Sequence, residues 1–327
     1  MINMSDYKKR IFEINSNDEF EKFCMIAFDY QMQYNPVYKL YSDHILKKQT
    51  PKNIYQIPFL PIEFFKSKKI LCKSKNEEIK FLSSGTQGIQ SKHYVADLKL
   101  YQKSFEKSFE KFYGNIDDYC FLALLPTYNE NKNSSLIYMI NHFINKTKNS
   151  GSGFYISNYD ELDHVVGKVE KLNRKIILFG VTYALLDFAK NYKRKLKNTI
   201  VMETGGMKGT RKELLKEEVH QILKSSFSIN SIHSEYGMTE LLSQAYSYGD
   251  NNFNTPNWMK VIIRDVNDPF TFIENKTGGI NIIDLANIYS CPFIATQDLG
   301  KKNPDNSFSL LGRFSEADVR GCNLLIQ

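Results

Sequence analysis

Two stretches of this chain carry apolar residues at every third or fourth position. Residues 18–34 and 98–112 both follow this spacing, which is typical of amphipathic helices. Between them, a short apolar run at 79–82 ends in a turn rich in serine and glycine. That pattern indicates a strand that leads into a loop.

The middle of the chain alternates between two kinds of pattern. Short apolar runs predict strands at 119–125, 175–180, 199–203 and 229–233. Helical spacing lies between and after them, at 135–146, 159–172, 182–194 and 210–224. Alternation of strands and helices predicts an α/β fold whose largely parallel sheet is flanked by helices on both faces.

From about residue 255 the pattern changes to short strand-like runs separated by turn residues. The runs lie at 261–263, 279–284, 293–296 and 308–311. They predict a smaller antiparallel β subdomain packed on the α/β body. We therefore expect one large domain over residues 1–313, with its β-rich part from about 255, and a short tail at 314–327.

Composition adds limits on partners. With 42% hydrophobic and 24% charged residues the chain is an ordinary globular protein, and its 23 Phe and 20 Tyr suit a thick core and an apolar ligand pocket. The net charge is +7, but Lys and Arg are scattered, and the densest cluster, at 190–197, is typical of a solvated helix end. We expect no nucleic-acid partner, whereas a mild positive field suits an anionic substrate such as ATP.

The five cysteines are odd in number and widely spaced, which argues against a disulfide framework and a zinc site. The N-terminus has no apolar signal core, and no run of about 18 apolar residues occurs. We expect no membrane span and a cytoplasmic protein.

The turn Ser83-Ser84-Gly85-Thr86-Gln87-Gly88 is the first candidate site. Its glycines allow positive φ angles, its hydroxyls can donate to phosphate oxygens, and successive backbone N–H groups can bind an anion. An ordinary serine-glycine turn is the alternative.

A second candidate is Tyr236-Gly237-Met238-Thr239-Glu240. A hydroxyl beside a carboxylate suits a phosphate and its magnesium ion. The alternative is a helix start, with Thr239 as the N-cap and Glu240 complementing the helix dipole.

Two further segments complete the set. In Thr296-Gln297-Asp298-Leu299-Gly300, followed by Gly312-Arg313, the aspartate can take both ribose hydroxyls, or it is a β-turn residue. In the segment 203–209, three glycines in five residues follow a strand, and flat backbone of this kind can pack on a purine ring or form a plain loop.

Together these segments resemble the adenylate-forming superfamily, the acyl-CoA synthetases and their relatives. SSGTQG resembles the superfamily's phosphate loop, and GGMKG resembles its adenine-side glycine segment. YGMTE matches the superfamily's tyrosine-glycine-x-threonine-glutamate motif. TQDLG resembles the ribose-binding segment, and GRFSEADVRG resembles the hinge motif. A narrower resemblance, to the acyl-protein synthetase of the bacterial bioluminescence fatty-acid reductase complex, rests on SSGTQGIQSKHYVADLKLYQKS, YGMTELLSQAY and RGCNLL.

The resemblance implies ATP and Mg²⁺ as cofactors, and it implies roles for single residues. The nucleotide would contact Ser83, Ser84, Gly85, Thr86, Gln87, Gly88, Gly205, Gly206, Tyr236, Gly237, Met238, Thr239, Asp298 and Arg313. Glu240 would bind the metal, and Thr86 and Lys92 would assist the chemistry. The acyl group would pass to Cys322, and a reductase or acyltransferase protein would then receive it. Tyr128, Thr182, Tyr183 and His233 are candidates for the acyl pocket.

The chain also departs from the superfamily pattern. Gln87 stands where threonine is usual, and Lys92 lies one place later than the family lysine. Only fourteen residues follow Arg313, so the C-terminal domain that carries a catalytic lysine is expected to be absent. Three functions stay open: acyl-protein ligase, a ligase that passes the acyl group to CoA or a carrier protein, and a non-catalytic binding subunit. On residue chemistry alone, Cys322 is either a nucleophile or a small buried apolar residue, and the other four cysteines are expected to be structural.

Overall fold

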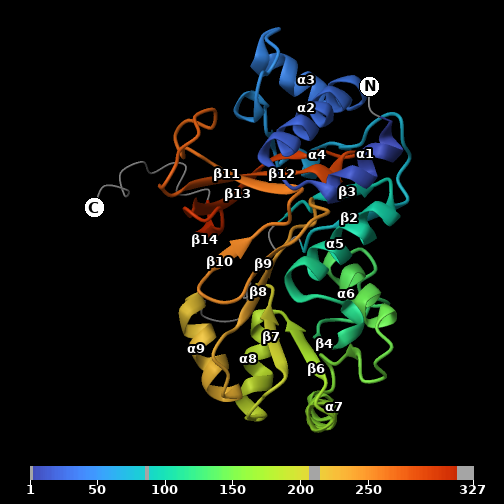
Figure 1. The fold of residues 1–327 in the computed structure, drawn as a ribbon, viewed down its shortest axis with the longest axis vertical. Helices are drawn as coiled ribbons and strands as arrows, with labels where there is room; N and C mark the ends of the chain where they lie inside the picture. The colour runs from blue at the N-terminus through green and yellow to red at the C-terminus, as the bar shows by residue number, and fades with distance from the viewer. Residues whose placement is uncertain (1–2, 85–87, 206–213, 315–327) are drawn as a thin grey trace. The chain divides into compact units, whose positions relative to one another are not determined.

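The structure is a computed structural model that describes residues 3–84, 88–205 and 214–314. Internal contacts divide the chain into two compact units (Figure 1). The first unit joins Met1–Asn76 to Asn251–Gln327, and the second is Glu77–Asp250. The first unit is therefore discontinuous in sequence, because it draws on both ends of the chain.

The second unit is built on a mainly parallel sheet. Its strands, in spatial order, are β9 (Ala245–Ser247), β8 (His233–Tyr236), β7 (Thr199–Glu203), β6 (Lys175–Gly180), β4 (Tyr119–Leu124) and β5 (Gly153–Phe154). All neighbours pair in parallel except β8 and β9, which are antiparallel. Every residue of β4 is buried, as expected for a strand covered on both faces.

Helices cover the two faces of this sheet. On one face lie α7 (Tyr159–Lys171), α8 (Thr182–Asn191) and α9 (Lys216–Phe227), which share an apolar core with Leu122 and Leu178. On the other face lie α5 (Leu98–Tyr113) and α6 (Ser135–Lys146), where Phe121 contacts the rings of Phe109 and Phe143. Successive residues of a strand therefore point into different cores.

A separate two-stranded hairpin precedes α5. Strands β2 (Ile79–Leu82) and β3 (Lys92–Val95) are antiparallel, with Leu82 opposite Lys92. Asp97 then caps α5, because its side chain accepts from the N–H of Leu100. The serine-glycine turn thus joins two strands of a hairpin.

The first unit contains an antiparallel sheet. Its order is β11 (Met259–Arg264), β12 (Gly278–Asp284), β13 (Phe293–Lys302), β14 (Phe308–Arg313) and β10 (Asn252–Asn254), and β1 (Leu60–Pro61) pairs in parallel with β13. The antiparallel β region predicted from about residue 255 is confirmed.

Side-chain caps begin the first three of the N-terminal helices of this unit. They are α1 (Met4–Arg10), α2 (Asn17–Tyr34), α3 (Pro36–Leu46) and α4 (Phe64–Ser67); short 3₁₀ turns lie at Ile11–Glu13, Ile54–Gln56 and Leu285–Asn287, and in the second unit at Ile116–Asp118. Asn35 separates α2 from α3. Its side chain accepts from the N–H groups of Val37 and Tyr38, and Pro36 holds the first helical position. The chain therefore turns at one residue without a loop.

Several predicted boundaries are wrong. The strand expected at 229–233 begins only at His233, because Ile229 donates its N–H to Lys224 O and so belongs to the closing turn of α9. The strand at 293–296 continues to Lys302, and the helix at 182–194 ends at Asn191. The helix expected at 210–224 begins at Lys216 among the described residues.

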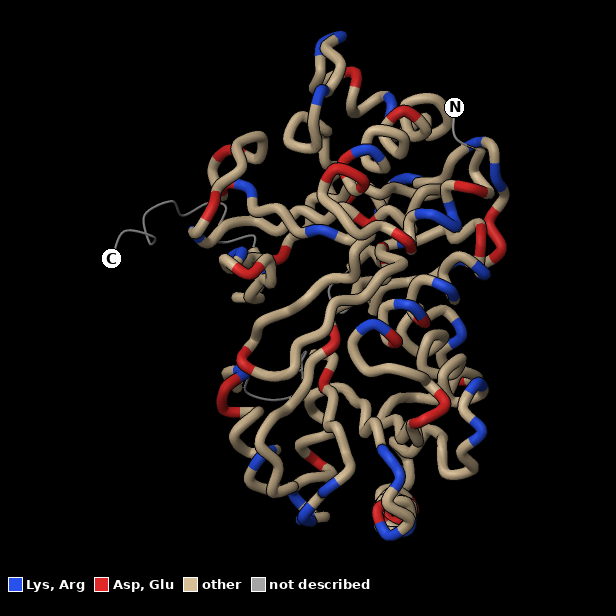
Figure 2. The backbone as a smooth tube through the Cα atoms, viewed as in Figure 1, with Lys and Arg blue, Asp and Glu red and all other residues tan. Residues whose placement is uncertain are grey.

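Charge is spread over the surface of both units. Figure 2 shows Lys and Arg interspersed with Asp and Glu along the backbone, as the sequence indicates. Within the part of the chain that the structure describes, no helix has both the length and the apolar character needed to cross a membrane.

Candidate nucleotide site

The predicted residues of the second unit gather at the carboxyl edge of its parallel strands. Strands β4, β6, β7 and β8 end at Leu124, Gly180, Glu203 and Tyr236, and they are neighbours in the sheet. The segments that follow contain Tyr128, Thr182, Tyr183, Gly205, Gly237, Met238, Thr239 and Glu240. Ligands of open parallel sheets bind outside this edge, so its position suits a nucleotide site.

Hydrogen bonds hold the loops after β6 and β7 together. The Thr182 N–H donates to Gly205 O at 2.9 Å, and the Thr204 N–H donates to Gly180 O at 3.2 Å. Gly205 has a φ of 70°, a left-handed conformation that glycine adopts without strain. Gly206 lies outside the described residues.

The serine-glycine loop is closed at its base. The Ser83 N–H donates to Ser91 O at 3.1 Å, and the Ser91 N–H donates to Ser83 Oγ at 3.0 Å. The Ser83 hydroxyl hydrogen is not used by that second bond and can donate to a ligand. Gly88 has a φ of 121°, which again favours glycine. Ser84 precedes Gly85, Thr86 and Gln87, and these three lie outside the described residues.

A buried histidine joins this hairpin to the second motif. His93 Nδ1 lies 2.7 Å from Thr239 O, and the His93 side chain is fully buried. This contact spans 146 positions in sequence. It brings the base of the serine-glycine loop beside the segment Tyr236–Glu240, while Lys92, next to His93, is exposed.

The segment after β8 is a turn rather than a helix start. Residues 237–244 lead directly from β8 to β9, and the Leu241 N–H donates to Met238 O at 3.1 Å. The alternative of Thr239 as a helix N-cap is therefore wrong. Tyr236 is buried, and its hydroxyl lies 3.9 Å from Met238 Sδ.

Glu240, in the same turn, is a buried carboxylate. A single carboxylate suits a magnesium ion that takes its other ligands from water and from nucleotide phosphates. Among the described residues, no group of three or more His, Cys, Asp and Glu side chains could form an all-protein metal site. The donor set fits a metal ion that arrives with ATP.

Two buried glutamates at this edge were given no role from the sequence. Glu203 ends β7, and the pKa of Glu203 is held well below its usual range. Burial by itself would raise that pKa, but His220, Lys216 and hydrogen bonds from Ser234 and Gly205 outweigh the burial.

Glu235, the second buried glutamate, lies on β8. Burial raises the pKa of Glu235 to about 7, and the charge of Glu203 adds to the rise while the Thr204 hydroxyl opposes it. No pattern in the sequence pointed to Glu235, because the strand predicted there ends at residue 233.

The acyl-pocket candidates have different surroundings. His233 lies at the start of β8, where its Nδ1 is 3.2 Å from the Tyr113 hydroxyl and its ring packs on Tyr248. Burial lowers the pKa of His233 to about 4, so this ring is neutral. Tyr128 contacts Tyr138, and Tyr183 is partly exposed. Their role in the acyl pocket stays a prediction.

The predicted ribose pair lies within the first unit. Asp298 of β13 faces Arg313 of β14, and Arg313 Nε donates to Asp298 Oδ1 at 2.8 Å. The segment Thr296–Gly300 is inside a strand, so the β-turn alternative is wrong. Asp298 is buried, whereas the Arg313 side chain is 57% exposed and accessible to a ligand.

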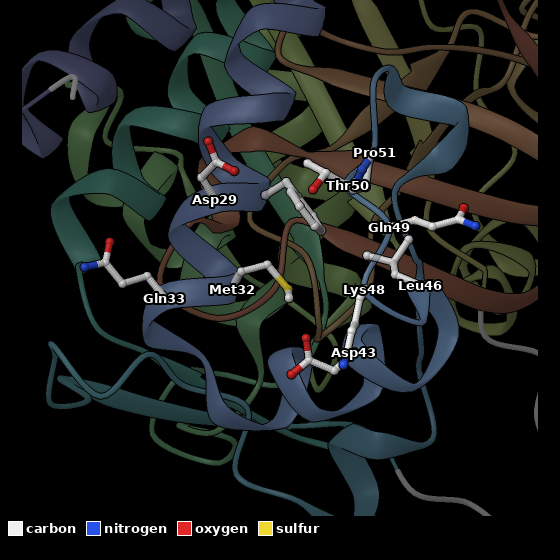
Figure 3. A pocket seen from close by; sticks show the side chains of 10 residues that line it. Asp29, Met32, Gln33, Asp43, Leu46, Lys48, Gln49, Thr50 and Pro51 are labelled. Atoms are coloured by element: carbon white, nitrogen blue, oxygen red, sulfur yellow. The ribbon is translucent and has the colours of Figure 1, made fainter.

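A surface pocket of about 440 Å³ lies in the first unit between α2 and the segment after α3 (Figure 3). Its lining includes Phe28, Met32 and Lys48. None of the predicted site residues lines this pocket, so it is a feature separate from the candidate nucleotide site.

The described cysteines have the properties of structural residues. Cys24, Cys72, Cys120 and Cys291 are all buried. Burial raises the pKa of each thiol, that of Cys72 to about 12. They stay protonated near neutral pH and are poor nucleophiles. Cys322 lies outside the described residues.

Solved structures share this fold. The chain is similar to ATP-bound MatB from Rhodopseudomonas palustris, with 14% identity, a TM-score of 0.55 and coverage of 72% of this chain and 47% of that one. It is also similar to the AMP complex of o-succinylbenzoate coenzyme A synthetase from Bacillus subtilis, with 14% identity, a TM-score of 0.50 and coverage of 73% and 49%. A luciferase-like enzyme from the mealworm Zophobas morio aligns with 14% identity, a TM-score of 0.52 and coverage of 74% and 59%.

These matches show the fold, which is that of the adenylate-forming enzymes, as predicted. The chain spans about half the length of MatB and of the synthetase. The family model described as Acyl-protein synthetase, LuxE, matches residues 7–327, and the chain belongs to this family. No curated protein matches it.

Proposed function

We propose that this protein activates a carboxylic acid, most simply a fatty acid, with ATP and then transfers the acyl group to its own Cys322. The observation that carries the first half is the contact between His93 and Thr239, which brings the serine-glycine loop beside the Tyr236–Glu240 turn at the carboxyl edge of the sheet. Family membership over residues 7–327 supports the second half.

The first step is the attack of a carboxylate oxygen on the α-phosphorus of ATP. A new O–P bond forms, the bond to the β-phosphate breaks, and pyrophosphate leaves. Backbone N–H groups and hydroxyls of the loop at Ser83 would hold the phosphates, and Lys92 would add positive charge. Mg²⁺ bound with ATP at Glu240 would neutralise phosphate charge.

The nucleoside would be held by residues of different strands. Asp298, with Arg313 beside it, offers carboxylate oxygens to the ribose hydroxyls. Tyr236 and the backbone at Gly205 would flank the adenine. Positioning of this kind supplies most of the catalysis in a reaction in which the protein makes no covalent bond.

In the second step the Cys322 thiolate, its proton lost to water, attacks the acyl carbon. A thioester forms, the bond between the acyl carbon and the phosphate oxygen breaks, and AMP leaves. A reductase or acyltransferase protein would then take the acyl group.

A second candidate function sends the acyl group to coenzyme A or a carrier protein. The similarity to a coenzyme A synthetase of the same fold favours it. The two candidates share the adenylation step and differ only in the thiol that accepts the acyl group.

The test uses radiolabelled fatty acid, ATP and Mg²⁺ with the full chain. We expect acid-dependent pyrophosphate exchange and label on the denatured protein. Cys322→Ser should abolish the label and keep the exchange. Cys72→Ala is the matched control, because that thiol is fully buried and should leave the label unchanged.

Other outcomes separate the candidates. Exchange without protein label, followed by acyl transfer to added coenzyme A or carrier protein, would overturn the cysteine step and favour the second candidate. No exchange with a panel of acids of different chain length would overturn acid activation itself.

A further inference from the structure

Glu203 receives contacts from four separate elements at the carboxyl edge. Its Oε2 accepts from the Gly205 N–H at 2.8 Å and from Thr182 Oγ1 at 3.3 Å. Its Oε1 accepts from Ser234 Oγ at 2.6 Å and lies 3.1 Å from Lys216 Nζ. These donors come from the start of α8, from the loop after β7, from β8 and from α9.

A second side chain of α9 lies on the same side. His220 Nε2 is 3.7 Å from Glu203 Oε1, and it has no hydrogen-bond partner among the described residues. That distance is too long for an ordinary hydrogen bond.

Both oxygens of Glu203 are therefore occupied, and the side chain is only 7% exposed. A carboxylate in this state has little capacity to bind a ligand itself. What it can do is fix the backbone around it, because charge-assisted hydrogen bonds are stronger than neutral ones and prefer a defined geometry.

The backbone that Glu203 fixes is that of Gly205. Its N–H is fixed by Glu203 and its carbonyl by the Thr182 N–H, so both polar groups of this residue have defined partners. Lys216 starts α9, which follows the glycine-rich segment in sequence. Glu203 thus contacts Gly205, where the glycine-rich segment begins, and Lys216, the first residue of α9, which follows that segment.

We propose that Glu203 is a positioning residue that holds the Gly205 backbone in the conformation that receives the nucleotide base. The inference rests on the proposed function, since that function places the base against Gly205. In this role Glu203 affects the affinity for the nucleotide and does not contact the acid substrate.

The experiment compares the wild type, Glu203→Gln and Glu106→Gln. Glu106 is the control because it is a glutamate that contacts a lysine and a histidine, Lys146 and His142, as Glu203 does, but it lies on α5 and is only partly buried. Glutamine keeps the shape of the side chain and removes the charge and one acceptor. Pyrophosphate exchange is measured against ATP and, separately, against the acid, and ATP binding is measured by the fluorescence of a labelled nucleotide.

We expect Glu203→Gln to raise KM for ATP and the nucleotide dissociation constant by about tenfold, with KM for the acid changed by less than about twofold. Glu106→Gln should match the wild type in KM for ATP, in KM for the acid and in the nucleotide dissociation constant. Equal changes in both KM values, or a dissociation constant within about twofold of the wild type, would overturn the proposal.

Two safeguards keep the test decisive. If Glu203→Gln does not fold, Ser234→Ala removes one donor to the same carboxylate and should raise KM for ATP by about threefold, and no rise would overturn the proposal. If the wild type binds nucleotide without exchange, the proposed function fails, while the binding comparison between the two glutamine variants still tests Glu203.

Discussion

Glu203 and Glu235 lie on neighbouring strands of the parallel sheet and differ in almost every other respect. Glu203 points toward α9, where it meets Lys216, His220 and a set of hydrogen-bond donors. Glu235 points to the other face, where its carboxylate accepts a hydrogen bond from Thr204 Oγ1 at 2.7 Å. The pKa of Glu203 is held low, while that of Glu235 is raised to about 7.

The comparison shows that burial alone does not decide the charge of a carboxyl group. Both residues are buried, with 5% of Glu203 and 7% of Glu235 exposed. Burial raises the pKa of each, but only Glu203 has several hydrogen-bond donors and the charge of Lys216 close enough to reverse the effect. One sheet edge thereby holds an ionised carboxylate on one face and, below neutral pH, a neutral acid on the other.

The largest expected effect concerns the stability of the Glu203 network. Glu203→Ala would leave the buried hydroxyls of Thr182 and Ser234 without their acceptor and the partly exposed Lys216 without its ion-pair partner. We expect a loss of about 3–5 kcal/mol in the free energy of unfolding. Urea denaturation followed by circular dichroism measures it. A midpoint equal to that of the wild type would show that the network does not stabilise the fold.

The next largest effect is a pH dependence of the free energy of unfolding that arises from Glu235. Because the folded-state pKa is about 7 and the unfolded value about 4.5, the folded protein holds a proton between these values that the unfolded chain has released. Glu235 therefore contributes most stability below about pH 4.5, and that contribution is lost as the pH rises toward 7.

Glu235→Gln should remove this dependence, because its side chain stays neutral. Above pH 7 we expect the variant to be more stable than the wild type by about 3 kcal/mol. The free energy of unfolding is measured from pH 5 to pH 8 for both proteins. Parallel curves would mean that Glu235 does not titrate in this range.

The opposite sign is expected for Glu203. Its lowered pKa stabilises the protein above the usual glutamate pKa, and this contribution is lost as the pH falls through the folded-state value. The two residues thus respond to pH in opposite directions, which separates them in one titration experiment.

The smallest effect is expected at Glu106. The side chains of Glu106 and its partners His142 and Lys146 are 22–34% exposed, so water screens the interaction. Glu106→Gln should change the free energy of unfolding by less than about 1 kcal/mol in the same urea experiment. A loss as large as that of Glu203→Ala would remove the distinction drawn here between the two networks.

Much of the fold was accessible from local patterns. The spacing of apolar residues predicts α2, α5 and α6 within a residue or two, and apolar runs predict β4, β6 and β7. The strand β8 was misplaced because its middle residues, Ser234 and Glu235, are polar and buried. A strand is identified by apolar residues, and here a polar network replaces them.

The sequence by itself determined the class of the protein. Contiguous motifs such as Tyr236–Glu240 and the turn at Ser83 carry the family resemblance, because a loop that meets a phosphate needs glycines and hydroxyls at adjacent positions. The alternation of strands and helices follows from the same local rules.

Only the tertiary structure decided which of these residues act together. His93 meets Thr239 across 146 positions, and Glu203 meets Ser234 across 31. The opposite charge states of Glu203 and Glu235 depend on which face of the sheet each side chain enters and on the cations that α9 brings there. Such long-range contacts form when strands pair and helices pack, so no local pattern in the sequence contains them.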